Sequence, residues 1–338
     1  MSLRLIQLQN GARRRVALVE EPYLHMLEAD SIHALAGEAI GRRAKLSDIA
    51  REKSTNEVVE YDAVYEAKSP WRILPSIDHP EDAARCLVSG TGLTHLGSAR
   101  DRQAMHVKDR PAEQIESLTD SMKMFRWGLE GGRPAAGCIG TSPEWFYKGT
   151  GAILRAHNEP LEVPSYAEDG GEEGEIAGVY VIGTDGTPYR IGMTTGNEFS
   201  DHCFEKRNYL YLASSKLRNC AIGPELVVDP EFSSVPGEVV IYRVARAVWS
   251  KKIRTGEAEM CHSLQNIEHH HFKFDEHRRA GDIHVHFFGA DCLSFGEGVR
   301  LANGDVMQIS FEGYGRPLKN AVRIEAKAST SARIVALE

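Results

Sequence analysis

The segment from residue 166 to 202, YAEDGGEEGEIAGVYVIGTDGTPYRIGMTTGNEFSDH, is dense in carboxylates and contains one fixed cation, Arg190. Three of its acids, Glu173, Glu175 and Glu198, lie where the surrounding pattern is typical of β-strands. Any fold of this chain must therefore bring negative charge onto neighbouring strands. That requirement limits which strand pairings and which compensating cations are possible.

The dipeptide Asp185-Gly186 between the two strands predicts a two-residue hairpin turn. With that turn, Glu173 lies directly opposite Glu198, at a Cα separation of about 4.5–5.5 Å. Glu175 follows two residues after Glu173 and points to the same face of the strand. Three converging carboxylates raise one another's pKa values, and a divalent cation relieves their repulsion. Oxygen ligands favour Mg²⁺, with Mn²⁺ or Ca²⁺ in its place, over zinc. A solvated acidic hairpin without metal remains the alternative.

Composition excludes several classes of protein. The 338 residues are 42% hydrophobic and 26% charged, and the net charge of −8 does not favour a nucleic-acid or anionic-membrane partner. No apolar run has transmembrane length, and the first residues lack the apolar core of a signal peptide. Six widely spaced cysteines indicate reduced thiols. We therefore expect a cytoplasmic protein.

The remaining pattern predicts a mixed α/β (α+β) fold that is rich in strands. Residues 3–20 read as a hairpin around Asn10-Gly11, and residues 29–53 as helical. Residues 112–130 form a predicted helix, and most segments after residue 160 resemble strands. One face of that helix is expected to carry Ile115, Leu118, Met122, Phe125 and Leu129.

Five motifs occur in one order along the chain. They are PEWFYK (143–148), Glu173-Gly174-Glu175, NEFSDHC (197–203), Lys216 before Gly223-Pro224, and GDVMQISFEGYGRPLKN (304–320). Over about residues 84–322 the chain thus resembles the fumarylacetoacetate hydrolase superfamily. Within it, the spacing is most similar to 2-keto-3-deoxy-arabonate dehydratases and to a bacterial branch found with arabinose-utilisation genes.

The resemblance implies an architecture and a metal site. It implies a fumarylacetoacetase C-terminal-domain-like β-barrel or β-roll over residues 84–330, with a lid segment at about 90–110. A smaller N-terminal α+β domain would occupy residues 1–83. Glu173, Glu175 and Glu198 would bind Mg²⁺, and the protein would form a homodimer or homotetramer.

The resemblance also implies a reaction. The expected activity is Mg²⁺-dependent dehydration of a 2-keto-3-deoxy sugar acid, of the 2-keto-3-deoxy-arabonate type, to 2,5-dioxopentanoate through a metal-bound enolate. Lys216 and Glu144 would be the catalytic acid–base pair, since burial and a neighbouring cation favour a neutral amine. The substrate, a small 2-oxo acid, would be bound by Lys148, Thr150, His95 and Asp291.

Three departures from the family pattern are informative. Glu198 stands where the family has Asp, and His202 where it has Arg. Ser98 occupies the position of a lid histidine that serves as general base in hydrolases and decarboxylases, although His95 is near. The absent base favours elimination over water activation.

Other functions stay open at this point. The same scaffold supports an acylpyruvate or diketo-acid hydrolase, an oxaloacetate-type decarboxylase, or a non-catalytic sugar-acid-binding protein. His284 and His286 share a strand face, which is compatible with a cupin-like metal site. A hydrogen-bonded position near the core, or at a subunit interface, is the other interpretation of these histidines.

Overall fold

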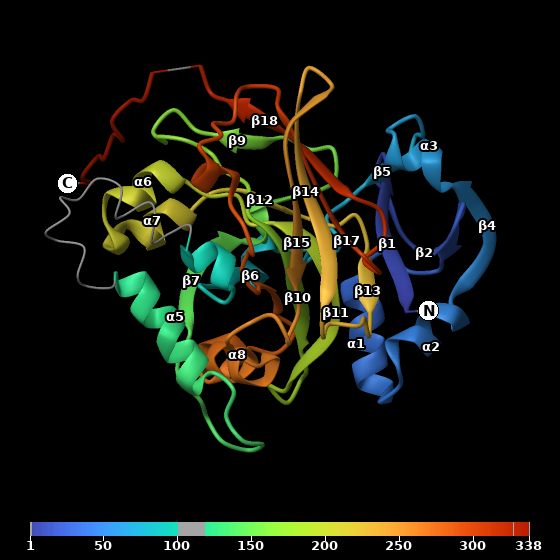
Figure 1. Cartoon of the computed structure of the whole chain (residues 1–338). Helices are drawn as coiled ribbons and strands as arrows, with labels where there is room; N and C mark the ends of the chain where they lie inside the picture. The colour runs from blue at the N-terminus through green and yellow to red at the C-terminus, as the bar shows by residue number, and fades with distance from the viewer. Residues whose placement is uncertain (1, 101–118, 327, 338) are drawn as a thin grey trace, which may run out of the picture.

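The computed structural model describes residues 2–100, 119–326 and 328–337, and within these ranges the strands form two sheets (Figure 1). The larger sheet runs in the order β4 (Ser54–Glu60), β3 (Tyr23–Leu27), β2 (Arg13–Glu20), β1 (Leu3–Asn10), β13 (Leu226–Val228), β11 (Pro188–Asn197), β10 (Gly174–Ile182), β16 (Ile283–Phe287), β6 (Cys86–Gly92) and β7 (Glu144–Thr150). Three short strands branch from it: β5 (Arg72–Ile73), β8 (Leu154–Arg155) and β12 (Cys220–Ile222).

The second sheet is made of five strands that lie after residue 160. Its order is β15 (Arg246–Thr255), β14 (Val235–Arg243), β17 (Val306–Phe311), β18 (Leu318–Ile324) and β9 (Leu161–Val163). The strand-rich mixed fold is confirmed, but in the described residues neither sheet closes on itself, so the expected barrel is not found. Gly174 of β10 lies against Val239 and Ile309 of the second sheet, where a Cβ would come within 2.7 Å of a Val239 methyl.

Seven helices with described bounds surround the sheets. They are α1 (Ile32–Arg42), α2 (Leu46–Glu52), α3 (Tyr61–Tyr65), α5 (Asp120–Gly131), α6 (His202–Arg207), α7 (Leu212–Lys216) and α8 (Leu264–Phe272). In Figure 1, α1–α3 lie on one side of the molecule with the first strands, and α5–α7 lie on the opposite side. None of the described helices is long and apolar enough to span a membrane.

Several sequence predictions need adjustment. The hairpin around Asn10-Gly11 is confirmed, and Ser31 caps α1 by accepting a hydrogen bond from the backbone of Ala34. The helical region that follows is two helices, because Arg43 adopts a left-handed conformation with φ of 51° that ends α1. In α5, Phe125 is buried but Leu129 is 62% exposed, whereas Ile115 and Leu118 lie outside the described residues.

The N-terminal strands continue the central sheet. Leu3–Leu5 of β1 pair with Leu226–Val228 of β13, and Leu5 belongs to the same core cluster as Val88 of β6 and Val179 of β10. The first strands are thus joined to the rest by both hydrogen bonds and apolar packing. The predicted boundary at residue 83 stays a prediction.

The β10–β11 hairpin reaches the predicted register by a different route. Its loop is three residues, Thr184–Gly186, closed by a hydrogen bond from Gly183 N to Thr187 O, with Gly186 at φ of 80°. The predicted two-residue turn is therefore wrong. Farther along, Ile191 forms a β-bulge opposite Tyr180. The bulge shifts the pairing by one residue, so that Gly174 faces Asn197 as the sequence predicted.

A buried histidine cluster connects α8 to the sheet. The indole Nε1 of Trp145 donates to His271 Nδ1 at 3.1 Å, and His271 Nε2 lies 2.9 Å from His284 Nδ1. Because an indole nitrogen only donates, His271 accepts at Nδ1 and donates from Nε2. Burial, with the neighbouring His277, lowers the pKa of His284 to about 3.

His286 lies in the same cluster. Its two ring nitrogens lie 2.8 and 2.7 Å from the hydroxyls of Ser89 and Thr91 on β6. Burial lowers its pKa to about 3, and His284 adds to this effect. The interpretation of these histidines as hydrogen-bonded core residues is confirmed, and among the described residues no metal-ligand grouping includes them.

The lowered histidine pKa values predict acid sensitivity. A histidine whose folded pKa is depressed contributes its full stability above pH 6.5 and loses it as pH falls toward 3. At pH 4.5 each such group costs up to about 2–3 kcal/mol of the free energy of unfolding. We expect His286→Gln to be less stable than wild type at pH 7.5, but to lose less on going to pH 4.5, as measured by urea unfolding. His25→Gln is the matched control, and parallel pH dependences for all three proteins would contradict the prediction.

Candidate active site

The three predicted acidic residues converge in the protein interior. Glu175 lies in β10, while Glu173 directly precedes this strand and Glu198 directly follows β11. The backbone of Glu198 donates to Glu173 O at 2.9 Å, which confirms that they face each other. These residues are at most 3% exposed, and one carboxylate oxygen from each lies within 4.8 Å of the others. A solvated acidic hairpin is therefore excluded.

The environment of these carboxylates opposes their ionisation. Burial, followed by the charges of Glu198 and Glu173, raises the pKa of Glu175 well above its usual value. Burial and Glu173 likewise raise the pKa of Glu198. Glu175 Oε2 is held by the backbone N–H of Gly289 at 2.7 Å. Three converging oxygens with excess negative charge fit a hard divalent cation, so these residues could hold Mg²⁺, Mn²⁺ or Ca²⁺.

Lys216 brings a positive charge directly to this cluster. It is the last residue of α7 and is fully buried. Its Nζ contacts Glu173 Oε1 and Glu198 Oε2, and it donates to Ser200 Oγ at 3.0 Å. The same ammonium lies 4.8 Å from the centre of the Phe146 ring. Lys216 thus stands between two of the three potential metal ligands.

Lys148 provides the second buried cation. Its Nζ contacts Glu198 Oε1 and donates to the backbone carbonyls of Phe199 at 2.7 Å and Lys216 at 3.1 Å. These three acceptors match the three donors of an ammonium. Lys148 therefore positions Glu198 and the backbone that carries Lys216, and its contact with substrate oxygens stays a prediction.

The structure adds residues whose role the sequence did not reveal. His202 Nε2 lies 3.1 Å from Glu173 Oε1, and Ser200 Oγ donates to Glu198 Oε1 at 3.1 Å. Burial opposes protonation of His202, but Glu173, with Asp169 and Glu205 nearby, outweighs it and raises the His202 pKa. The motif NEFSDH contained both residues, yet only their three-dimensional position shows which carboxylate each contacts.

Glu144 lies at the start of β7, on the strand face that also carries Phe146 and Lys148. Its side chain is 5% exposed, and its Oε2 accepts a hydrogen bond from the Tyr209 hydroxyl at 2.7 Å. Thr150 ends the same strand six residues later, about 20 Å of extended chain away. The structure therefore does not bring Thr150 to Glu144.

The other two predicted substrate contacts are engaged elsewhere. His95 is buried with its ring nitrogens 2.8 and 3.1 Å from the hydroxyls of Thr94 and Thr255, and burial lowers its pKa to about 4. Asp291 accepts from the backbone of Arg254 at 3.2 Å and lines a separate cavity of about 710 Å³. Ser98 donates to His95 O at 3.2 Å. Residues 101–110 of the predicted lid lie outside the described residues.

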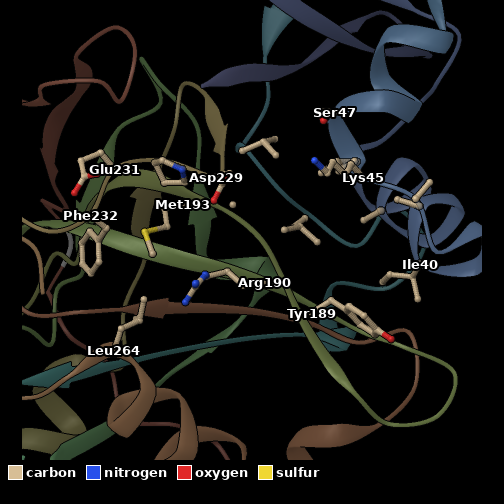
Figure 2. A pocket seen from close by; sticks show the side chains of 18 of the residues that line it. Ile40, Lys45, Ser47, Tyr189, Arg190, Met193, Asp229, Glu231, Phe232 and Leu264 are labelled. Atoms are coloured by element: carbon tan, nitrogen blue, oxygen red, sulfur yellow. The ribbon is translucent and has the colours of Figure 1, made fainter. Parts of the chain in front are cut away.

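A larger cavity of about 970 Å³ lies away from the three glutamates (Figure 2). Ile40 and Lys45 line it from the N-terminal helical region, and Tyr189, Arg190 and Met193 from β11. Arg190, which points into this region in Figure 2, forms an ion pair with Glu268 of α8. Neither acid–base groups nor metal ligands of the glutamate cluster line this cavity.

The contacts of Lys148 predict a large stability effect. Lys148→Met leaves Glu198 with one buried cation fewer and removes a donor from two buried carbonyls, of which Lys216 O keeps the backbone N–H of Arg218 at 2.9 Å. Removing one partner of a buried ion pair costs about 3–5 kcal/mol. We expect a loss of that size in urea unfolding, partly restored by millimolar Mg²⁺. Lys123→Met, which removes a half-exposed charge on α5, is the control, and a loss below about 1 kcal/mol for Lys148→Met would refute this role.

The chain resembles dehydratases both in sequence and in structure. No family model matches the chain. A curated relative from Haloferax volcanii, a probable 2-keto-3-deoxyxylonate dehydratase, is 28% identical over 186 residues, which are 53% of this chain. The match spans only 60% of that relative's length.

Solved structures match over nearly the whole chain. 2-Keto-3-deoxy-D-arabinonate dehydratase, complexed with magnesium and 2,5-dioxopentanoate, has a TM-score of 0.70 at 19% identity and covers 96% of this chain and 100% of its own. Fumarylacetoacetate hydrolase from Exiguobacterium antarcticum has a TM-score of 0.59 at 17% identity, with the same coverage. The chain therefore shares the fold of these two enzymes, in agreement with the resemblance of its five motifs.

Proposed function

We propose that this protein is a Mg²⁺-dependent dehydratase of a 2-keto-3-deoxy sugar acid. The observation that carries the proposal is the convergence of three buried glutamates with the amine of Lys216 between two of them. The dehydratases among the relatives and among the structures of the same fold support it. An activity that needs only binding would not require a buried lysine within reach of a metal site.

Glu173, Glu175 and Glu198 would hold the cation. When bound, Mg²⁺ supplies Lewis-acid polarisation of the 2-oxo acid, which makes its C3 protons more acidic. The protein's own contribution is to hold the carboxylates in place: Gly289 N fixes Glu175, and Lys148 fixes Glu198. Because all three side chains are buried, water is largely excluded and their interactions with a charged substrate are strengthened.

The acid–base roles fall to Lys216 and Glu144. As a neutral amine, Lys216 removes a proton from C3 of the substrate. Glu144, held by the Tyr209 hydroxyl, donates a proton to the departing C4 hydroxyl, which leaves as water. The C3=C4 double bond then shifts as a proton leaves C5 and one adds to C3, which gives a C4=C5 enol. Transfer of the enol hydroxyl proton to C4 converts C5 to the aldehyde. A 2-keto-3-deoxypentonate thereby gives 2,5-dioxopentanoate and one water.

The resemblance carries further expectations that stay predictions. The protein would act in pentose catabolism in the cytoplasm, as a homodimer or homotetramer. Its competing activity would be hydrolysis or decarboxylation of a diketo acid. Against that activity, His95 and Ser98, the described residues nearest the expected lid base, are hydrogen-bonded within the protein.

A substrate panel separates these activities. We expect 2-keto-3-deoxypentonates, incubated with protein and Mg²⁺, to lose one water in mass spectrometry without C–C cleavage, and chelation by EDTA to stop the reaction. Acylpyruvates and oxaloacetate serve as competing substrates. Turnover of those compounds, with none of any deoxy sugar acid, would replace the dehydratase by a hydrolase or decarboxylase.

The role of Lys216 as a base is tested by isotope exchange. Lys216→Met keeps the length and packing of the side chain but removes the amine, and we expect kcat to fall by about 10²–10⁴. Exchange of the substrate C3 proton with D₂O, followed by NMR, should slow in parallel. Lys123→Met serves as control. If Lys216→Met exchanges that proton at the wild-type rate, Glu144 is the base instead, and Glu144→Gln should then abolish exchange.

A further inference from the structure

We infer that the ammonium of Lys216 is the built-in counter-ion of the metal-free site, and that a divalent cation must displace it from Glu173 and Glu198. This inference rests on the proposed metal-dependent function and extends it to how the site is loaded. Its basis is that Lys216 Nζ contacts one oxygen of each of these two glutamates. Both residues also belong to the grouping that could hold the metal.

Lys216 differs in this respect from the other buried lysine. Lys148 contacts Glu198, and its Nζ also donates to the backbone carbonyls of Phe199 and Lys216, which hold it in place. Lys216 Nζ instead contacts side chains of the site, namely the two glutamates and Ser200. Of these two lysines, Lys216 is the one that bridges two of the potential metal ligands.

A divalent cation held by Glu173 and Glu198 would lie next to the Lys216 ammonium, which contacts one oxygen of each of these residues, and the two positive charges would repel each other. The flexible lysine stem permits a shift of the ammonium. The Phe146 ring on β7 already lies 4.8 Å from Nζ, so an ammonium that leaves the two glutamates can keep this cation–π contact. Metal binding would then both load the site and release Lys216 from the two carboxylates.

The contacts of Lys216 stabilise the folded protein when no metal is bound. Without Lys216, three buried carboxylates within 4.8 Å would lose a cation that contacts two of them, while Lys148 would still contact Glu198 and His202 would still contact Glu173. Repulsion among them would destabilise the folded state or force their protonation. The lysine thus protects the empty site and lowers its apparent affinity for the metal.

The test measures metal binding without substrate. At pH 7.5, calorimetric titration with Mg²⁺ and Mn²⁺ should show Lys216→Gln binding at least 10-fold more tightly than wild type. Its metal-free Tm should be lower, and its rise in Tm on saturation larger. Lys123→Met, with the same change in net charge, should bind as wild type does. Equal affinities for Lys216→Gln and wild type would overturn the inference while leaving the metal-dependent function intact.

A measurement on the wild-type protein guards against misfolding of the variant. In ¹⁵N-lysine-labelled protein, the Nζ resonance of Lys216, assigned by its absence in Lys216→Gln or Lys216→Arg, should shift on Mg²⁺ binding and saturate with it. An unchanged resonance at full metal occupancy would refute displacement. If wild type binds neither metal at millimolar concentration, the proposed metal-dependent function itself fails, and this inference fails with it.

Discussion

The charge balance of three buried carboxylates is the constraint on which this structure depends. Glu173, Glu175 and Glu198 lie within 4.8 Å of one another and are almost fully buried, a state that isolated charges could not maintain. Lys148 and Lys216 reach them from two different elements, β7 and α7. The sheet, the helical segment and the buried lysines are therefore parts of one electrostatic arrangement, and a change in any of them alters the ionisation of the others.

The helical segment from α6 to α7 connects the site with its surroundings. It carries His202 to Glu173, Tyr209 to Glu144, and Lys216 to two glutamates. Asp201 begins the segment by capping α6 and pairs with Arg218 just beyond its end. One ion pair thus ties both ends of the segment together, which fixes the three side chains relative to one another.

Much of this site could be predicted from sequence because strand geometry is periodic. The two-residue spacing of Glu173 and Glu175 placed both on one face. The opposition of Glu173 and Glu198 was predicted from a two-residue turn, whereas a three-residue loop and the bulge at Ile191 produce the same register. The order of the five motifs indicated the fold, although the expected closed barrel is not found in the described residues. Side-chain partners were less predictable, since a motif does not state direction: the contact of Lys148 with Glu198 was not foreseen.

The positions of other predicted residues depend on features that a local sequence pattern does not contain. His95 is close in sequence to the expected lid, but its burial between Thr94 and Thr255 depends on β15, a strand 160 residues away. Thr150 shares a strand with Glu144, yet the length of that strand separates them. The single helix expected near residue 43 is split by one backbone angle that the pattern of apolar residues does not encode.

The bulge at Ile191 has a consequence for how this hairpin can vary. A hairpin with a two-residue loop and no bulge contains the same number of residues as a hairpin with a three-residue loop and one bulge. Both arrangements place Glu173 opposite Glu198. The length of the loop at residues 184–186 therefore does not by itself determine how the carboxylates at the other end of the strands are placed. This loop is a suitable site for sequence variation between homologues, or for inserting a peptide or a fluorescent label. A change of one residue in the loop can be compensated by a bulge, so that the pairing next to the carboxylates is kept.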